Sequence, residues 1–107
     1  MPALGDSAQA SVTHVRDPDG LDVIAISGEL DLSNVNIVRR ELDLAVGESS
    51  RPLVFELSHL GFIDSSGIAL LVQVATRVEH VSIRNASPLI RRVLETTGVA
   101  AVLPMKP

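Results

Sequence analysis

The sequence contains no cysteine, no tryptophan and no tyrosine, and its aromatic residues are two phenylalanines. Without cysteine the chain has no disulfide, no thiolate metal site and no thiol nucleophile. Its three histidines are far apart in the sequence, so we expect no metal site and no cofactor. The scarcity of aromatic residues also removes the stacking surfaces with which proteins bind single-stranded nucleic acid.

Positive charge and long apolar runs are scarce as well. Nine Lys and Arg residues against thirteen Asp and Glu give a net charge of -4, which disfavours binding to nucleic acid. No apolar run approaches the roughly 18 residues that a membrane-spanning helix needs, and the N-terminus lacks a signal-peptide pattern. We therefore expect a cytoplasmic protein that does not insert into a membrane. The 107 residues provide for one domain with a core of Val, Leu, Ile and Ala.

Strand and helix patterns alternate along the chain. Residues 1–10 show no hydrophobic period, so we expect a flexible arm there and one domain over residues 11–107. Hydrophobic spacing and turn residues predict strands over 11–16, 21–27, 53–57, 81–84 and 99–103, and helices over 34–46, 68–79 and 88–97.

Capping residues mark the ends of two of these helices. Ser33 is the predicted N-cap of the first helix and Gly47 its stop, followed by a return loop over residues 48–52. The last helix is the best marked, with Ser87 as N-cap, Pro88 at the first position and Gly98 just past the end.

This order of elements predicts an α/β fold with a mostly parallel sheet of four to five strands. An antiparallel strand lies at the N-terminal edge, and about three helices cover the sheet. Binding sites in such sheets gather at the C-terminal ends of the strands. Two predicted loops, 28–32 and 58–66, leave the sheet at that end, so we expect Glu29 and Asp31 to lie close to Asp64 and Ser65.

Asp64, Ser65, Ser66 and Gly67 form a polar turn before the second helix. Their short side chains can accept hydrogen bonds from the free amides of a helix start, and a helix start favours negative charge. An exposed serine there is well placed to become a phosphoserine. Taken alone, these four residues are more typical of an N-cap cluster without further function. Ser66 is a better candidate for a cap than for a phosphorylation site.

A catalytic serine is the least favoured interpretation of this turn. A nucleophile elbow needs glycine two residues before the serine, whereas Ile63 occupies that position before Ser65. Directly after the turn, Ile68, Ala69 and Leu70 follow in succession, which is more than one helix face can bury. They form either an exposed binding patch or a surface covered by the other helices.

Three segments together resemble the STAS domain of bacterial anti-sigma factor antagonists: Gly28–Asp31, Phe62–Gly67 and Ser87–Gly98. The resemblance covers about residues 11–105. It differs at residues 77–81, where the glycine-containing turn of relatives is missing and the connection is short, so the second helix should end early.

The resemblance implies a protein-interaction switch rather than an enzyme. In that family the unmodified antagonist binds an anti-sigma factor, an ATP-dependent serine kinase, and so frees a sigma factor for transcription. The kinase phosphorylates the first serine after the aspartate, which is Ser65 here, and a serine phosphatase restores it. The family's acidic residue that shapes the site by hydrogen bonding corresponds to Asp31. Further expected site-shaping and partner-binding residues are Glu29, Asp64, Ser66, Gly67 and Ile68.

Two other functions are compatible with the sequence. One is a STAS interaction subunit of a membrane transport or stress-signalling complex, without a phosphorylation switch. The other is a hydrolase that uses Ser65, although no histidine is placed by the sequence as its base.

Overall fold

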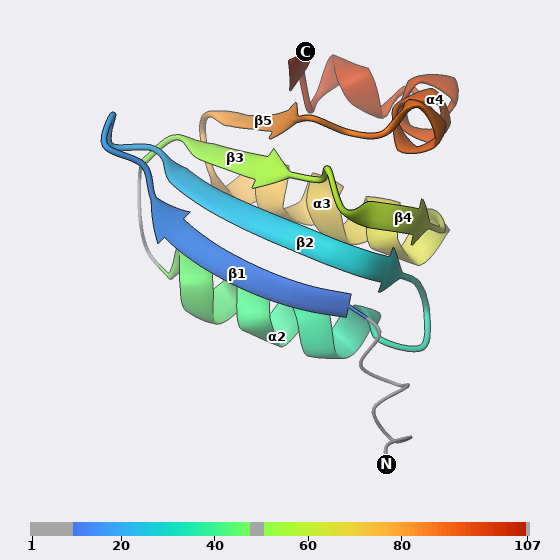
Figure 1. Cartoon of the computed structure of the whole chain (residues 1–107), viewed down its shortest axis with the longest axis horizontal. Coiled ribbons are helices and arrows are strands. Elements are labelled where there is room, and N and C mark those ends of the chain that lie inside the picture. The colour runs from blue at the N-terminus through green and yellow to red at the C-terminus, as the bar shows by residue number, and fades with distance from the viewer. Residues whose placement is uncertain (1–9, 48–50, 107) are drawn as a thin grey trace.

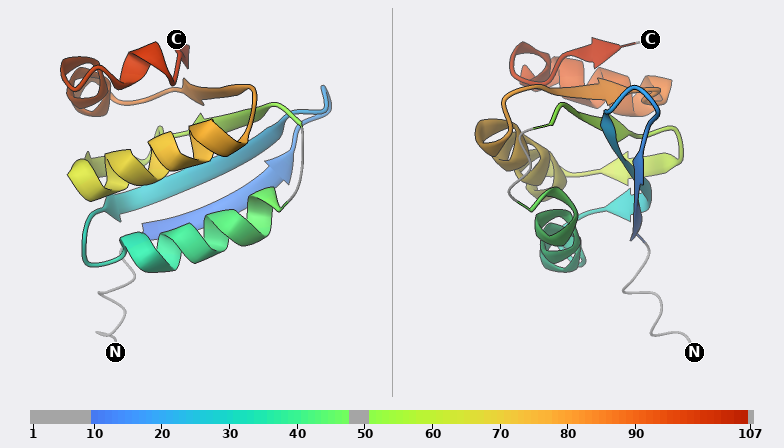
Figure 2. Two further views of the ribbon diagram at one scale, coloured as in Figure 1. Left: turned by 180° about the vertical axis from the view of Figure 1, so that it is seen from behind. Right: turned by 90° about the vertical axis from the view of Figure 1, so that its left-hand side faces the viewer.

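A six-stranded sheet and the helices packed around it make up residues 10–47 and 51–106, which are the residues described by the computed structural model (Figure 1). The strands are β1 (Ala10–Arg16), β2 (Asp22–Leu30), β3 (Leu53–Glu56), β4 (Leu60–Ile63), β5 (Val81–Arg84) and β6 (Met105–Lys106). The helices are α2 (Val35–Val46), α3 (Ser65–Arg77), α4 (Pro88–Thr96) and the short 3-10 helix η1 (Val99–Ala101). Seen from behind, α2 and α3 lie in front of the sheet (Figure 2).

The strand order is β1-β2-β3-β5-β6, with β4 also paired to β2. β1 is antiparallel to β2 at the edge, and the other pairs are parallel. The predicted fold class is therefore confirmed. Strand β1 begins at Ala10, one residue inside the predicted arm, and residues 1–9 of that arm lie outside the described residues.

β4 was not expected, because residues 58–66 carry a short apolar stretch interrupted by Gly61 and flanked by polar residues. In the structure β2 continues to Leu30, beyond the predicted end at residue 27, and offers β4 a pairing edge. The first half of β2 pairs with β3 and the second half with β4, with a register shift between Gly28 and Glu29. Residues 28–30 of the first predicted loop and residues 60–63 of the second are therefore strand, and residues 65–66 already belong to α3.

The helices agree with the prediction in number but not at every end. Asn34, not Ser33, precedes the first turn of α2, and Gly47 follows its last turn with a positive φ of 55°, as expected. The return loop predicted over 48–52 falls partly on residues 48–50, which lie outside the described residues. Helix α3 begins three residues before the predicted start and ends early, at Arg77.

The C-terminal region combines a confirmed helix with a wrong strand. Ser87 caps α4 through a bond from the Ile90 amide to its hydroxyl (3.3 Å), and Gly98 follows with a φ of 78°. Residues 99–103 do not form the predicted strand, because the left-handed Gly98 turns the chain into η1. The last strand, β6, comes only after Pro104 and pairs with β5.

The core between sheet and helices is aliphatic, as the composition predicts. Ile24, Ile26, Leu71 and Ile83 are fully or almost fully buried, and Phe55 is the one aromatic side chain among them. Among the described residues, no helix has the length and apolar character needed to cross a membrane.

Candidate functional site

Asp64 is the residue that builds the turn between β4 and α3. It has extended backbone angles, and its Oδ1 accepts hydrogen bonds from the amides of Ser66 (2.9 Å) and Gly67 (3.1 Å). The Ser66 hydroxyl donates to the same oxygen at 2.6 Å. These bonds satisfy amides that have no partner within the helix.

The two serines of the turn have different roles in this arrangement. Ser66 is half-buried and its hydroxyl is held by Asp64. Ser65, the first residue of α3, is exposed, and within the described part of the chain its hydroxyl forms no hydrogen bond. The hydroxyl of Ser65 is thus the one available to another protein.

Gly67 is required by close packing beneath the turn. A Cβ atom at this position would lie 2.8 Å from Ile63 Cγ1, 2.8 Å from Leu30 Cγ and 3.0 Å from the Leu30 carbonyl oxygen. The absence of a side chain therefore lets α3 start directly against the end of β2. This contact fixes where the helix, and with it Ser65, emerges from the sheet.

Asp64 also connects the turn to the segment between β2 and α2. Its Oδ2 accepts a hydrogen bond from the Leu32 amide (3.2 Å), and its own amide donates to the Leu30 carbonyl (3.2 Å). The hydrogen bond from the Ser66 hydroxyl, helped by those from the Gly67, Leu32 and Ser66 amides, lowers the pKa of Asp64 below its ordinary value of 3.8, despite the opposing effect of burial.

The other acidic residues of this end lie on the neighbouring segment, as expected. The Asp31 carboxylate accepts bonds from the Ser33 amide (2.9 Å) and hydroxyl (2.6 Å), so it shapes its own loop. The hydrogen bond from this loop to the turn comes from the main chain of Leu32. Glu29 is exposed at the end of β2, where it pairs with Phe62 of β4.

Asn34 was not singled out from the sequence, yet it organises the loop that carries Asp31. It is 3% exposed, its Nδ2 donates to the Glu29 carbonyl (2.8 Å), and its Oδ1 accepts from the Asp31 amide (3.1 Å). The signal available in the sequence was an amide residue directly before the apolar period of α2.

Of the two alternatives for residues 68–70, an exposed patch or a covered surface, the structure favours the covered surface. Leu70 is buried, Ile68 is half-buried against the core, and Ala69 is exposed. Exposed large apolar side chains come instead from the surrounding elements: Leu32 before α2 (75% exposed), Phe62 in β4 (46%) and Leu89 in α4 (59%).

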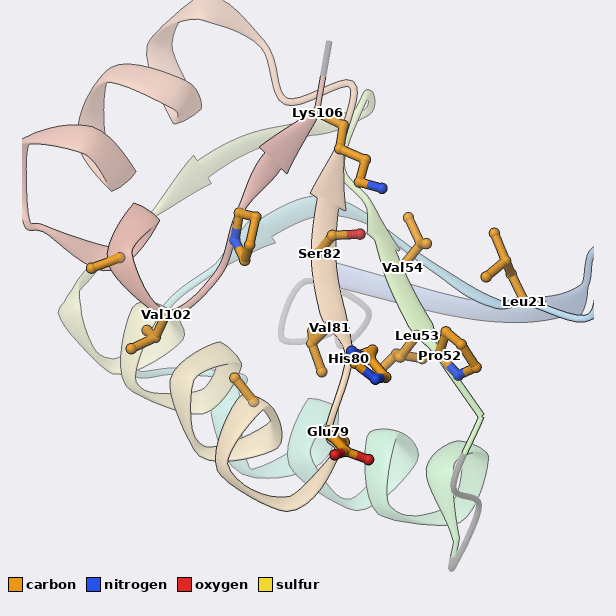
Figure 3. A pocket seen from close by; sticks show the side chains of 13 residues that line it. Leu21, Pro52, Leu53, Val54, Glu79, His80, Val81, Ser82, Val102 and Lys106 are labelled. Atoms are coloured by element: carbon orange, nitrogen blue, oxygen red, sulfur yellow. The ribbon is translucent and has the colours of Figure 1, made fainter.

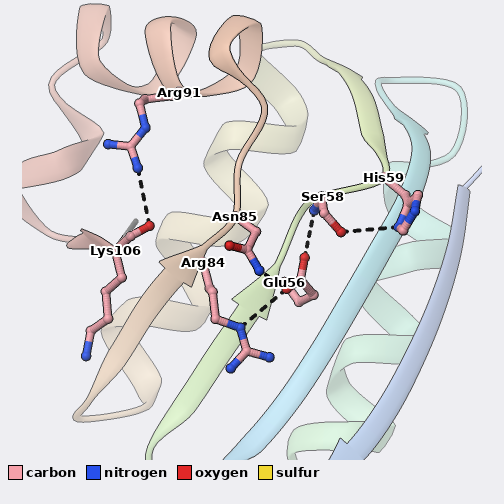
Figure 4. A network of polar contacts seen from close by, with 7 residues as sticks. All are labelled: Glu56, Ser58, His59, Arg84, Asn85, Arg91 and Lys106. Atoms are coloured by element: carbon pink, nitrogen blue, oxygen red, sulfur yellow. Dashed lines mark hydrogen bonds and ion pairs between the residues drawn. The ribbon is translucent and has the colours of Figure 1, made fainter.

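A polar network lies beside the site at the ends of β3 and β5 (Figure 4). Glu56 accepts hydrogen bonds from the Ser58 amide (2.8 Å), Asn85 Nδ2 (2.7 Å) and Arg84 Nε (3.3 Å). Burial of Glu56 raises its pKa, but hydrogen bonding from the side chain and amide of Ser58, and from Asn85 and Arg84, outweighs burial and holds the pKa below the ordinary 4.5. The network joins the β3–β4 and β5–α4 connections, and His59 bonds to the Ser58 hydroxyl (3.2 Å).

A pocket of about 410 Å³ lies at the other end of the strands, where β3 and β5 begin (Figure 3). Pro52, Leu53, His80, Val81, Val102 and Lys106 are among its lining residues, and Ser65 is not. The exposed serine is thus a feature of the surface rather than of this pocket.

Comparison with known proteins identifies the family. The profile of the STAS domain family matches residues 13–107. An anti-sigma F factor antagonist of Lysinibacillus sphaericus is 32% identical over 82 residues, which make up 72% of this chain and 70% of that protein. The chain belongs to the STAS-domain family of anti-sigma factor antagonists. The segments that resemble the STAS domain, including the turn at Ser65, lie within the matched residues.

Solved structures share the STAS fold described above. An anti-sigma factor antagonist from Mycobacterium paratuberculosis superposes with a TM-score of 0.81 at 25% identity, covering 92% of this chain and 86% of that one. The anti-sigma factor antagonist SpoIIAA in its unphosphorylated form has a TM-score of 0.72 at 22% identity, covering 91% of this chain and 89% of its own. SpoIIAA has also been solved in a phosphorylated form.

Proposed function

We propose that this protein is an anti-sigma factor antagonist switched by phosphorylation of Ser65. Unmodified, it binds in the cytoplasm to an anti-sigma factor that is also an ATP-dependent serine kinase, and so regulates sigma-factor-dependent transcription. The kinase transfers phosphate to Ser65, the complex separates, and a serine phosphatase restores the hydroxyl. The observation that carries this proposal is the exposed hydroxyl of Ser65, which has no hydrogen-bond partner among the described residues, whereas the neighbouring Ser66 hydroxyl donates to Asp64.

The geometry of the turn explains how a phosphate would act there. Asp64 already occupies the amides of Ser66 and Gly67, so a phosphate on Ser65 stays on the surface instead of settling into the helix start. It adds about -1.5 to -2 charges beside a carboxylate with a lowered pKa. Glu29 and Asp31 on the neighbouring segment make the same end of the sheet acidic. Within residues 10–47 and 51–106 the Ser65 hydroxyl forms no hydrogen bond, so we expect the fold to survive the modification.

The effect on a complex follows from charge and desolvation. The partner surface fits a neutral hydroxyl at Ser65. After modification the same surface faces a charged phosphate, which it repels or which must lose its bound water before the complex can form. A loss of about 3 kcal/mol is enough to weaken binding by more than a hundredfold. The switch therefore works by local electrostatics at the interface and needs no refolding.

A hydrolase function is less well supported by the same geometry. In the described part of the chain no histidine bonds to Ser65, and His59 bonds to Ser58 instead. A serine without a base is a poor nucleophile but a suitable acceptor for a phosphate delivered by another enzyme.

The test is phosphorylation by the anti-sigma factor kinases of the source organism. Each purified kinase is incubated with ATP and the parent protein, Ser65→Ala or Ser66→Ala, and the products are mapped by mass spectrometry. We expect one phosphate on Ser65 in the parent and in Ser66→Ala, and none in Ser65→Ala. Phosphate on Ser66, or unchanged labelling of Ser65→Ala, contradicts the proposal.

A further inference from the structure

Leu32 stands out among the residues around the switch. It lies between β2 and α2, its side chain is 75% exposed, and no other large apolar side chain described at this end is as exposed. Exposure of a large apolar side chain to water does not stabilise the fold. When the main chain holds such a side chain in a fixed position, the exposure indicates a contact with another molecule. The Leu32 amide is held by Asp64 Oδ2 at 3.2 Å.

The loop that carries Leu32 is built to a fixed shape. Buried Asn34 bonds to the Glu29 carbonyl and the Asp31 amide, and the Asp31 carboxylate bonds to Ser33. The Asp31 carbonyl also accepts from the Asn34 and Val35 amides (3.1 and 2.9 Å). A side chain presented by such a loop loses little further backbone freedom on binding, which is the condition for an efficient anchor.

Asp64 has two functions because its two oxygens have different partners. Oδ1 caps α3, whereas Oδ2 holds a residue 32 positions earlier in the chain. The carboxylate next to the phosphorylated serine is thus the same group that fixes Leu32. Asp64 therefore lies next to the proposed phosphorylation site and also fixes the position of Leu32.

We propose that Leu32 is a hydrophobic anchor that inserts into an apolar recess of the anti-sigma factor, and that Asp64 is its positioning residue. This inference rests on the proposed function and adds the contact that gives the unmodified complex its affinity. The recess lies next to the part of the partner that meets the Ser65 hydroxyl. Phosphate on Ser65 then acts beside the anchor, where the interface is most tightly packed.

The anchor is tested with two matched leucine variants. Leu32→Ala removes the proposed anchor, and Leu44→Ala truncates an equally exposed leucine (80%) near the other end of α2. Affinity for each anti-sigma factor kinase of the source organism is measured in the absence of ATP. Burial of a leucine in an interface corresponds to roughly 10- to 100-fold in affinity, so we expect that loss for Leu32→Ala and less than twofold for Leu44→Ala.

The positioning role is tested with Asp64→Asn. Asparagine is as good an N-cap as aspartate, so its oxygen keeps the bonds to Ser66 and Gly67, while its NH₂ group cannot accept from the Leu32 amide. Loss of one such bond should weaken binding by up to about tenfold. The variant is also combined with Leu32→Ala. If Asp64 acts through Leu32, the double variant binds no more weakly than Leu32→Ala alone.

The outcomes separate the anchor from the function. If the parent protein binds an anti-sigma factor and Leu32→Ala binds it with an affinity within twofold of the parent's, the anchor is overturned and the proposed function stands. Additive losses in the double variant overturn the positioning role. If the parent binds no anti-sigma factor, the proposed function fails and the anchor fails with it. Thermal unfolding of every variant excludes misfolding as the cause of weak binding.

Discussion

Replacement of Gly67 by alanine tests the packing that sets the position of the switch. Alanine gains about 1 kcal/mol over glycine from helix propensity alone. The added methyl group, however, would meet Ile63 Cγ1 and Leu30 Cγ at 2.8 Å and the Leu30 carbonyl at 3.0 Å. The side chains can move, but the carbonyl belongs to β2 and accepts the Asp64 amide. Overpacking of this kind costs about 1–3 kcal/mol, so the clash prevails and α3 is pushed from the sheet.

The measurement is equilibrium unfolding in urea, compared between the parent, Gly67→Ala and Gly61→Ala. We expect Gly67→Ala to be destabilised by up to about 2 kcal/mol, the overpacking cost of about 1–3 kcal/mol less the helix-propensity gain of about 1 kcal/mol. Each kcal/mol lost lowers the melting temperature by roughly 4–8 °C. Gly61→Ala is the control, because its Cβ would lie 3.8 Å from the Gly28 carbonyl, an ordinary contact. A Gly67→Ala protein more stable than the parent, by the roughly 1 kcal/mol of helix propensity, would show that α3 is not held against β2 in this way.

Three further predictions concern stability. The pKa values of Asp64 and Glu56 are lowered in the folded protein, so the ionised carboxylates stabilise the fold above about pH 4.5, and this stabilisation is lost as the pH falls through their pKa values in the folded state. Urea unfolding between pH 7 and pH 3 should show the loss. The free energy of unfolding should fall less steeply with pH in Glu56→Gln. Asn34→Ala leaves the Glu29 carbonyl and the Asp31 amide without their partner, so the free energy of unfolding should fall by about 1–3 kcal/mol. Ser87→Ala removes the cap of α4 and should cost about 1 kcal/mol. If the free energy of unfolding of one of these variants equals that of the parent, the hydrogen bond removed in that variant does not stabilise the fold as proposed.

Local signals were sufficient for most of the fold. Turn residues and capping residues act within a few positions, which is why the β1–β2 hairpin, Gly47 and the ends of α4 were predictable. Strand β4 was not, because its four residues become a strand only by pairing with the extended end of β2. The strand predicted over residues 99–103 was wrong because their apolar pattern suits a strand, whereas the left-handed conformation of Gly98 starts a 3-10 helix there.

The residue types of the site were predictable from the sequence, but not all of the hydrogen bonds that connect them. The sequence placed an aspartate, two serines and a glycine before a helix, and strand order brought Glu29 and Asp31 to the same end. The different roles of the two serines come from a local hydrogen bond from Ser66 to Asp64, two residues away, and the sequence already favoured Ser65 over Ser66 as the phosphorylation site. The link between the two segments was not predictable, because the Leu32 amide reaches Asp64 only through the tertiary fold.

The central claim is that a phosphate on Ser65 breaks a complex without disturbing the fold. The direct measurement is the affinity of fully Ser65-phosphorylated protein for its anti-sigma factor by calorimetry, with circular dichroism and thermal unfolding of both forms. The account predicts binding at least a hundredfold weaker than that of the unmodified protein, with the same spectrum and a similar melting temperature. Equal affinity of the two forms, or loss of the folded spectrum on phosphorylation, would contradict it.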